Sequence, residues 1–532
     1  MNLCSLFWKL ALLLSVGAVS VVAQPLPRRA IVVCPTSFRS ALQPWCEFRE
    51  SQGIQLEFVV PESTAAKTRD AILQAKANQD ITAVVLVGDA PAYLQGEKPP
   101  SKSTPIPTFY HPAKANVPFG SEPEIAADDR YARLVNDDKR RVAIGRFPVQ
   151  TSQQLENLVT RIIEYETRFA NSMGKRQVHF VAGVGGFGPL VDGLLDTATR
   201  RLIGDGIPGS LNVSMTYARW QSPFCPTPSD FSQFTIDRLN QGGLFWVYIG
   251  HGSRYQLDAL KVPGFQPLPI YRQPDVQKVE MRGIPPICVF LSCYSGAFDS
   301  PHASVGEQML LAEKGPVAVL AATRVTMPYA MSLMADSMLR QTFVHRRDTL
   351  GEIVMLAKQE LVSHQGGSAN RVLLDRVAAA VSPSADLLDE ERNEHALMFH
   401  LLGDPLLRIN YPLGMRVKCP AIISNGHSLT VQFNSPISGT CAVELVTQRG
   451  IQREQPESRQ LAKAESPQWN RLTTEYQAAN DPVWVSKRVV ISKGDQTVEV
   501  PVSGVRTGLQ VVRVVVQGKS QIAIGSTQVF VK

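Results

Sequence analysis

Short apolar runs alternate with segments of helical periodicity as far as residue 321, and this alternation constrains the fold more than any other feature of the chain. Each run is four to seven residues long, and most are rich in Val, Ile and Leu. Such runs are typical of parallel strands that are covered on both faces and connected by helices. The chain is therefore predicted to have an α/β fold of the doubly wound type. The expected strands lie at residues 30–34, 56–60, 83–87, 141–144, 178–182, 211–216, 244–249, 286–292 and 316–321.

The number of expected strands predicts more than one structural unit. Nine strands exceed an ordinary mononucleotide-binding sheet, and 532 residues exceed what one hydrophobic core supports. We therefore expect two side-by-side α/β subdomains, over residues 24–175 and 176–411. Residues 95–127 interrupt the pattern with many prolines and no periodicity, which is typical of a long surface excursion.

The sequence pattern changes after residue 411. Residues 412–532 carry short β-branched runs separated by turn residues such as Asn425-Gly426. This spacing predicts a self-contained β-sandwich. It holds no His-Cys or acidic pairing, so its expected role is docking or stabilisation.

Residues 1–23 are expected to be a signal peptide. Lys9 precedes an apolar run over residues 10–23, which is shorter than the roughly 20 residues that a membrane-spanning helix needs. The run ends in Val21-Val22-Ala23, whose small residues suit a signal peptidase. No other segment reaches about 18 consecutive apolar residues, so we expect an exported chain without stable membrane insertion after signal removal.

Charge and cysteine content narrow the choice of partners. The 54 basic and 47 acidic residues give a net charge of +7 without long runs of like charge, so nothing supports a nucleic-acid partner. Seven cysteines follow residue 23, and an odd number in an exported chain suggests a free, reactive thiol. A disulfide between Cys34 and Cys46 or between Cys419 and Cys441 would close a short loop. Both pairings remain alternatives, as do buried free thiols.

Two of the expected strands end in residues suited to nucleophilic catalysis. The run at 244–249 ends in Gly250-His251-Gly252-Ser253, and the run at 286–292 is followed by Cys293. Ligands bind at the carboxyl ends of strands in open α/β sheets. His251 lies 42 residues before Cys293, which allows one crossover between neighbouring strands. A lone histidine there is more often structural, but a thiol with an imidazole in reach is an activated nucleophile. We therefore predict Cys293 as the nucleophile and place Cys288 in the core.

These residues resemble the gingipain family of secreted cysteine peptidases, which belongs to the caspase-like clan. The resemblance covers about residues 28–411 and rests on apolar blocks that end in His-Gly and in Cys-x-x-Gly. It implies a caspase-like catalytic unit of two side-by-side α/β subdomains, followed by an immunoglobulin-like β-sandwich over residues 412–532. The motifs are Gly250-His251-Gly252, Cys293-Tyr294-Ser295-Gly296, Val85-Leu86-Val87-Gly88-Asp89, residues 128–131, Ile144-Gly145-Arg146-Phe147-Pro148 leading to Tyr165-Glu166, residues 315–323 and Leu402-Gly403-Asp404-Pro405.

The resemblance also implies roles for individual residues. Cys293 would be the nucleophile and His251 the proton-transferring partner, with the backbone amides of Gly252 and Cys293 as the oxyanion hole. Asp128 or Asp129 could approach His251 as a third, carboxylate member of the catalytic set. Acidic residues at such positions are, however, usually caps or solvated.

Specificity is where the chain departs from the family pattern. Well-known members cut after Arg or Lys, using an acidic pocket residue and an aromatic residue from the loop after the next strand. Here that loop carries Arg324 and Tyr329. Arg324 would oppose a basic substrate side chain, so a trypsin-like preference is not expected.

Two further features are expected to be structural. The glycine-rich residues 183–188 lack the lysine of a phosphate-binding loop. Glu394, His395 and His400 lack another ligand at a fixed spacing, so they are expected to be capping or core residues and not a metal site.

The leading hypothesis is an exported cysteine endopeptidase that acts on proteins or peptides through a thioester acyl-enzyme. One alternative is a sortase-like processing or transpeptidase enzyme, which would pass the acyl group to an amine. Another is a catalytically silent caspase-like scaffold that binds surfaces, which the presence of both His251 and Cys293 disfavours. The chemistry requires no cofactor, and the resemblance implies structural Ca²⁺, for which acidic residues within 122–129 offer oxygen ligands. Substrate identity and oligomeric state stay open.

Overall fold

The computed structural model describes most of the chain after residue 27. The described residues are 28–76, 80–92, 105–134, 142–185, 204, 206–363, 368–382, 384–453, 459 and 468–532. The predicted signal peptide, residues 1–23, lies outside them, as do residues 186–188 of the glycine-rich segment. Within the described residues, no helix is both long enough and apolar enough to cross a membrane.

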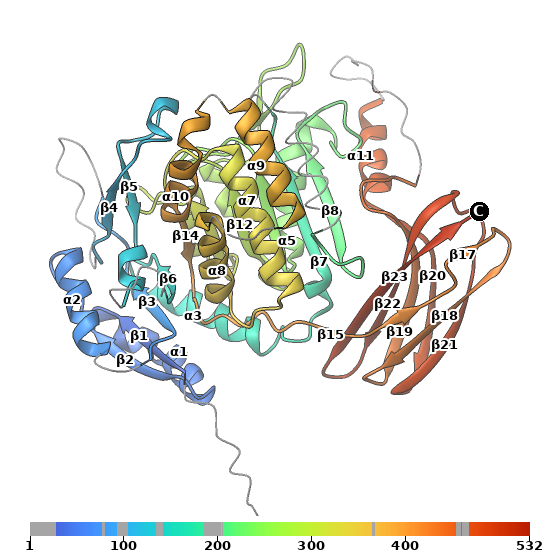
Figure 1. The fold of residues 1–532 in the computed structure, drawn as a ribbon, viewed down its shortest axis with the longest axis horizontal. Coiled ribbons are helices and arrows are strands. Elements are labelled where there is room, and N and C mark those ends of the chain that lie inside the picture. Colours follow the sequence, from blue (N-terminus) through green and yellow to red (C-terminus); the bar gives the residue numbers. More distant parts are fainter. Residues whose placement is uncertain are drawn as a thin grey trace, which may run out of the picture.

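A single ten-stranded sheet forms the centre of the protein (Figure 1). Every neighbouring pair in it is parallel except β13 and β14, which are antiparallel. In spatial order the strands are β2 (Gln55–Val59), β1 (Arg29–Val33), β3 (Ala83–Val87), β6 (Ala143–Phe147), β14 (Phe399–Leu402), β13 (Ala318–Ala322), β12 (Ile287–Leu291), β9 (Phe245–Ile249), β7 (Gln177–Ala182) and β8 (Asn212–Tyr217).

The continuity of this sheet refines the expectation of two side-by-side subdomains. The strands of the first expected subdomain, β1, β2, β3 and β6, form one end of the sheet. Strands β7, β8, β9, β12 and β13 of the second form the other end. Strand β14, which the sequence analysis did not predict, joins them because it pairs with β13 on one side and with β6 through Leu402 and Arg146 on the other. The two halves therefore share one sheet.

The continuous apolar runs arise because both faces of the sheet are covered. Along β1, Ala30 and Val32 face the main core, whereas Ile31 and Val33 face a smaller core with Ile72 of α2. Helices α7 to α10 pack together on one face of the sheet (Figure 1). The α-helices with described bounds between residues 28 and 411 are α1 (Arg39–Ser51), α2 (Ala65–Lys76), α3 (Ser152–Glu166), α5 (Phe231–Gln241), α6 (Val305–Leu311), α7 (Pro328–Leu339), α8 (Leu350–Val362), α9 (Ala369–Val381) and α10 (Leu388–Met398).

The predicted surface excursion contains a hairpin. Strands β4 (Phe109–Pro112) and β5 (Glu124–Ala127) pair antiparallel, and the connection between them carries Glu122. Proline-rich composition obscured this hairpin in the sequence, because its strands are only four residues long.

The C-terminal region consists of two sheets that share one hydrophobic core and lie beyond β8 (Figure 1). Its immunoglobulin-like topology stays a prediction. One sheet contains β15 (Leu413–Gly414), β17 (Ile422–Ile423), β19 (Gly439–Thr447), β20 (Val483–Ile491), β22 (Gly508–Gln517) and β23 (Ile522–Val531), and the other contains β16 (Val417–Lys418), β18 (Ser428–Ser435) and β21 (Gly494–Pro501).

A helix in this region, α11 (Gln468–Ala479), was not predicted and connects it to the large sheet. The Tyr476 hydroxyl lies 2.8 Å from that of Thr216 in β8. The Asn480 side chain accepts the N–H of Met215 at 2.7 Å and donates to the Met215 carbonyl at 3.1 Å. These contacts cover part of the edge of β8, so the C-terminal region is not packed as a separate unit.

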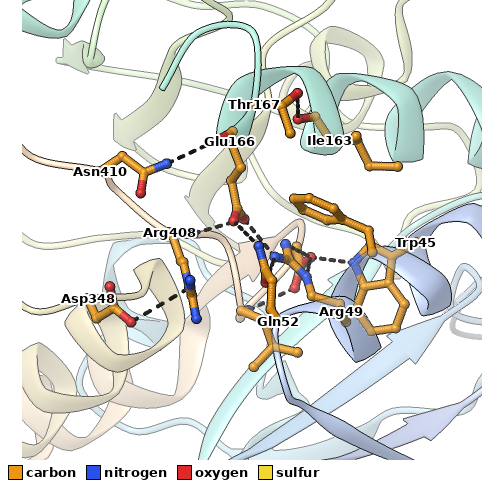
Figure 2. Close-up of polar contacts among 12 residues, drawn as sticks. Trp45, Arg49, Gln52, Ile163, Glu166, Thr167, Asp348, Arg408 and Asn410 are labelled. Atoms are coloured by element: carbon orange, nitrogen blue, oxygen red, sulfur yellow. Dashed lines mark hydrogen bonds and ion pairs between the residues drawn. The ribbon is translucent and has the colours of Figure 1, made fainter. Parts of the chain in front are cut away.

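A buried ion network ties the turn after β14 to the first helix. Arg49 of α1 pairs with Asp404 at 2.6 Å and with Glu166 of α3 at 2.8 Å, and all three side chains are almost fully buried. The indole of Trp45 donates to the same Asp404 oxygen. Figure 2 shows Trp45 and Glu166 on either side of the Arg49 side chain. The turn at Gly403-Asp404-Pro405 is therefore a structural anchor.

Replacing Arg49 by Met tests this anchor. Arg49→Met would leave two buried carboxylates without their cation, so we expect the free energy of unfolding in urea to fall by about 3–5 kcal/mol. Arg28→Met is the control, because Arg28 pairs with Asp348 in an exposed position and its loss is expected to cost less than about 1 kcal/mol. Equal, small losses in the two variants would contradict the anchoring role.

Candidate active site

The register between β9 and β12 brings the two predicted catalytic residues together. Ile249 of β9 pairs with Leu291 of β12, and His251 and Cys293 each stand two residues further along. Neighbouring strands lie about 4.8 Å apart, so the two residues leave the sheet side by side. His251 is exposed and Cys293 is partly exposed.

The other cysteines do not compete with Cys293 for this role. All seven described cysteines are free thiols, so neither of the two short loops is closed by a disulfide. Cys288 is fully buried within β12, and burial raises the pKa of its thiol well above the ordinary value. It is a core residue, as predicted.

Gly252 is the position at which the two strand ends touch. A Cβ atom on Gly252 would lie 2.9 Å from the Cys293 carbonyl oxygen and 3.0 Å from the Ser292 side chain, which leaves no room for any other residue. Among the residues that the structure describes, the backbone N–H groups of Gly252 and Cys293 donate to no other protein group.

Two hydrogen bonds hold the backbone carbonyl of His251. The Tyr248 hydroxyl donates to the His251 carbonyl at 2.7 Å, and the N–H of Asp258 donates to the same carbonyl at 3.1 Å. A buried tyrosine hydroxyl needs such a partner. Tyr248 was not singled out from the sequence, where it reads as part of an apolar strand.

The loop after β13 contacts the sulfur of Cys293. The N–H of Thr326 donates to Sγ at 3.3 Å, and the Thr326 hydroxyl lies 3.5 Å from it. The next amide, Met327, donates to Nε2 of His395 in α10 at 2.7 Å. Burial lowers the pKa of His395 to about 4, so the ring is neutral and can accept this bond. His395 is thus a core histidine, as expected, and it supports the loop beside the nucleophile.

Arg324 does not face a substrate pocket. Its guanidinium is 1% exposed and forms two bonds to Asp299, at 2.7 and 3.0 Å. Tyr329 is half-buried, and its hydroxyl donates to Asp375 of α9 at 2.7 Å. The expectation that Arg324 opposes basic substrates loses its basis, because Asp299 already neutralises its charge.

The two aspartates considered as a third member have partners elsewhere. Asp128 is fully buried and bonds to Arg146 of β6 through both oxygens, each at 2.8 Å. Asp129 pairs with His111 at 3.0 Å and with Arg133 at 2.8 Å. Four strand spacings, about 19 Å, separate β6 from β9 in the sheet. Asp128 is therefore not placed to orient His251, and the contacts of Asp129 give no support for that role.

The acidic residues expected to hold calcium do not form a common site. Glu122 pairs with Arg254, Asp128 with Arg146, and Asp129 with Arg133, so these three carboxylates face cationic side chains. In the described part of the chain, no three His, Cys, Asp or Glu side chains gather as a metal site would need. Calcium binding stays a prediction that this arrangement does not favour.

The chain is similar to known peptidases over most of its length. The profile of peptidase family C25 matches residues 23–410. Gingipain R2 of Porphyromonas gingivalis is 23% identical over 448 residues, which cover 78% of this chain and 52% of the relative. Gingipain R1 of the same organism is 22% identical over 448 residues, covering 78% and 39%. The chain thus spans about half the length, or less, of the curated relatives it matches.

Solved structures show the same fold. The crystal structure of the Arg-specific cysteine proteinase gingipain R has 17% sequence identity, covers 95% of this chain and 98% of its own, and gives a TM-score of 0.50. A structure described only as a protease has 15% identity, the same coverage and a TM-score of 0.52. At these identities the likeness establishes the fold alone. Since the family profile matches nearly three quarters of the chain, with both predicted catalytic residues inside the match, this protein belongs to peptidase family C25.

Proposed function

We propose that this protein is an exported cysteine endopeptidase with Cys293 as the nucleophile and His251 as its proton-transferring partner. The observation that carries the proposal is the register of β9 and β12, which sets both residues at equivalent positions on neighbouring strand ends. Family membership supports a cysteine-type peptidase. The apolar segment before residue 24 supports export.

The proposed reaction proceeds through a thioester. His251 takes the thiol proton of Cys293, and the thiolate attacks the scissile carbonyl carbon. The negative charge that develops on the carbonyl oxygen is met by the amides of Gly252 and Cys293, a contribution typically worth on the order of 3 kcal/mol. His251 then protonates the leaving amine, and water releases the acyl group from sulfur as a carboxylic acid.

The substrates are proposed to be proteins or peptides. Because Asp299 neutralises Arg324, that residue no longer argues against substrates with basic side chains. The C-terminal region is proposed to stabilise the catalytic unit, which the contacts of Tyr476 and Asn480 with β8 support.

Cys293→Ala is expected to abolish peptide cleavage, because it removes the sulfur that forms the thioester. The thermal midpoint should stay close to that of the wild type, since Cys293 lies at a partly exposed strand end. Cleavage of a peptide library by the purified protein is the measurement. Cys288→Ala is the matched control and should retain cleavage; loss in Cys288→Ala together with activity in Cys293→Ala would overturn the assignment.

His251→Ala is expected to lower kcat by about 10²- to 10⁴-fold, the usual contribution of a general acid or base. It should also slow alkylation of Cys293 by iodoacetamide at pH 6, because an imidazolium beside a thiol favours the thiolate. His427→Ala, in the C-terminal region, serves as the control and should match the wild type in both assays. Identical alkylation rates in the wild type and His251→Ala would show that the two residues are not coupled.

A further inference from the structure

One carboxylate lies between the three loops that build the candidate site. Glu122, from the connection between β4 and β5, accepts a hydrogen bond from the Tyr294 hydroxyl at 2.5 Å. Its other oxygen accepts a bond from the Arg254 guanidinium. Arg324 Nε lies 3.7 Å from the oxygen that Tyr294 contacts. Glu122 therefore contacts the loop after β9, the loop after β12 and the loop after β13.

Each of these partners is close in sequence to a residue of the candidate site. Arg254 follows His251 by three residues, and Tyr294 directly follows Cys293. Arg324 precedes Thr326, whose N–H donates to the Cys293 sulfur, by two residues. A displacement of Glu122 would therefore alter the surroundings of His251, Cys293 and Thr326.

The backbone next to Cys293 needs such support. Tyr294 has a φ of +56°, a left-handed conformation that residues other than glycine rarely adopt. It is held by its own N–H, which donates to the Arg324 carbonyl at 3.1 Å, and by its hydroxyl bond to Glu122. Strained residues of this kind persist only where the surroundings fix them.

The contacts of Arg254 extend the same cluster. Its guanidinium lies 4.3 Å from the centroid of the Tyr294 ring, and its Nε donates to the Ser300 hydroxyl at 2.9 Å. Burial alone would raise the pKa of Glu122, but the bonds from Tyr294 and Arg254 outweigh it and lower that pKa below the ordinary value. The carboxylate is thus charged and matches the cations around it.

We propose that Glu122 is a positioning residue for this site: it fixes the His251 and Cys293 loops relative to each other through Arg254 and Tyr294. The inference rests on the proposed peptidase function and adds a residue to it. Glu122 comes from the first of the two expected subdomains, residues 24–175, whereas His251, Cys293 and Thr326 come from the second, residues 176–411. The first subdomain therefore contributes to the site without supplying the nucleophile or its partner.

The test is the isosteric variant Glu122→Gln. It removes the charge that both arginines face while keeping an oxygen for Tyr294, so we expect kcat for peptide cleavage to fall about 10- to 100-fold. KM should change less than about threefold and the thermal midpoint little, because the loss concerns alignment in the transition state. Alkylation of Cys293 by iodoacetamide should slow about tenfold. Glu280→Gln is the control: Glu280 forms an exposed pair with Lys314 before the amino end of β12 and should match the wild type.

Tyr294→Phe removes only the hydroxyl and keeps the ion pair between Glu122 and Arg254. It therefore provides a second test if Glu122→Gln fails to fold. Its kcat is expected to fall at least about fivefold. Wild-type kcat and alkylation rates in the folded variants, or a lower thermal midpoint as the sole change, would overturn the positioning role. A wild-type protein that cleaves no peptide would overturn the proposed function instead, and the alkylation rates would still decide the role of Glu122.

Discussion

The parallel register between β9 and β12 is the constraint on which the candidate site depends. His251 and Cys293 each lie two residues beyond the last paired position of their strand. The close approach of Gly252 to Ser292 and Cys293 is possible only because these strands leave the sheet together and position 252 has no Cβ. The loop after β13 then reaches the sulfur because β13 is the next strand in the sheet.

The sequence was informative about the strands that lie inside the sheet. Their apolar runs follow directly from burial on both faces, and β3, β9 and β12 lie where these runs are found. Strand β14 escaped prediction because it is short, contains His400 and directly follows α10. Helix α11 escaped because it stands among β-branched runs that predict strands, and its contacts with β8 are made across more than 200 residues of chain.

The same limit applies to the site. His251 and Cys293 could be predicted because each has a local signature, an apolar run that ends in glycine-flanked or nucleophilic residues. The charges of Arg324 and Asp128 are neutralised by Asp299 and Arg146, partners 25 and 18 residues away that no local pattern indicates. Thr326 and Glu122 carry no local signal at all, since their importance comes from where the fold places them beside Cys293 and its neighbours.

The place of β14 has a consequence for the order in which this protein assembles during synthesis. The strand that joins the two halves of the sheet is the last of its ten to leave the ribosome. Until about residue 402 has been made, β6 and β13 each present an unpaired edge, and His395 is not yet there to hold Met327. A nascent chain would therefore carry both His251 and Cys293 well before the loop that contacts the sulfur is secured. Met327 can therefore gain its contact with His395 only after the other nine strands of the sheet have been made.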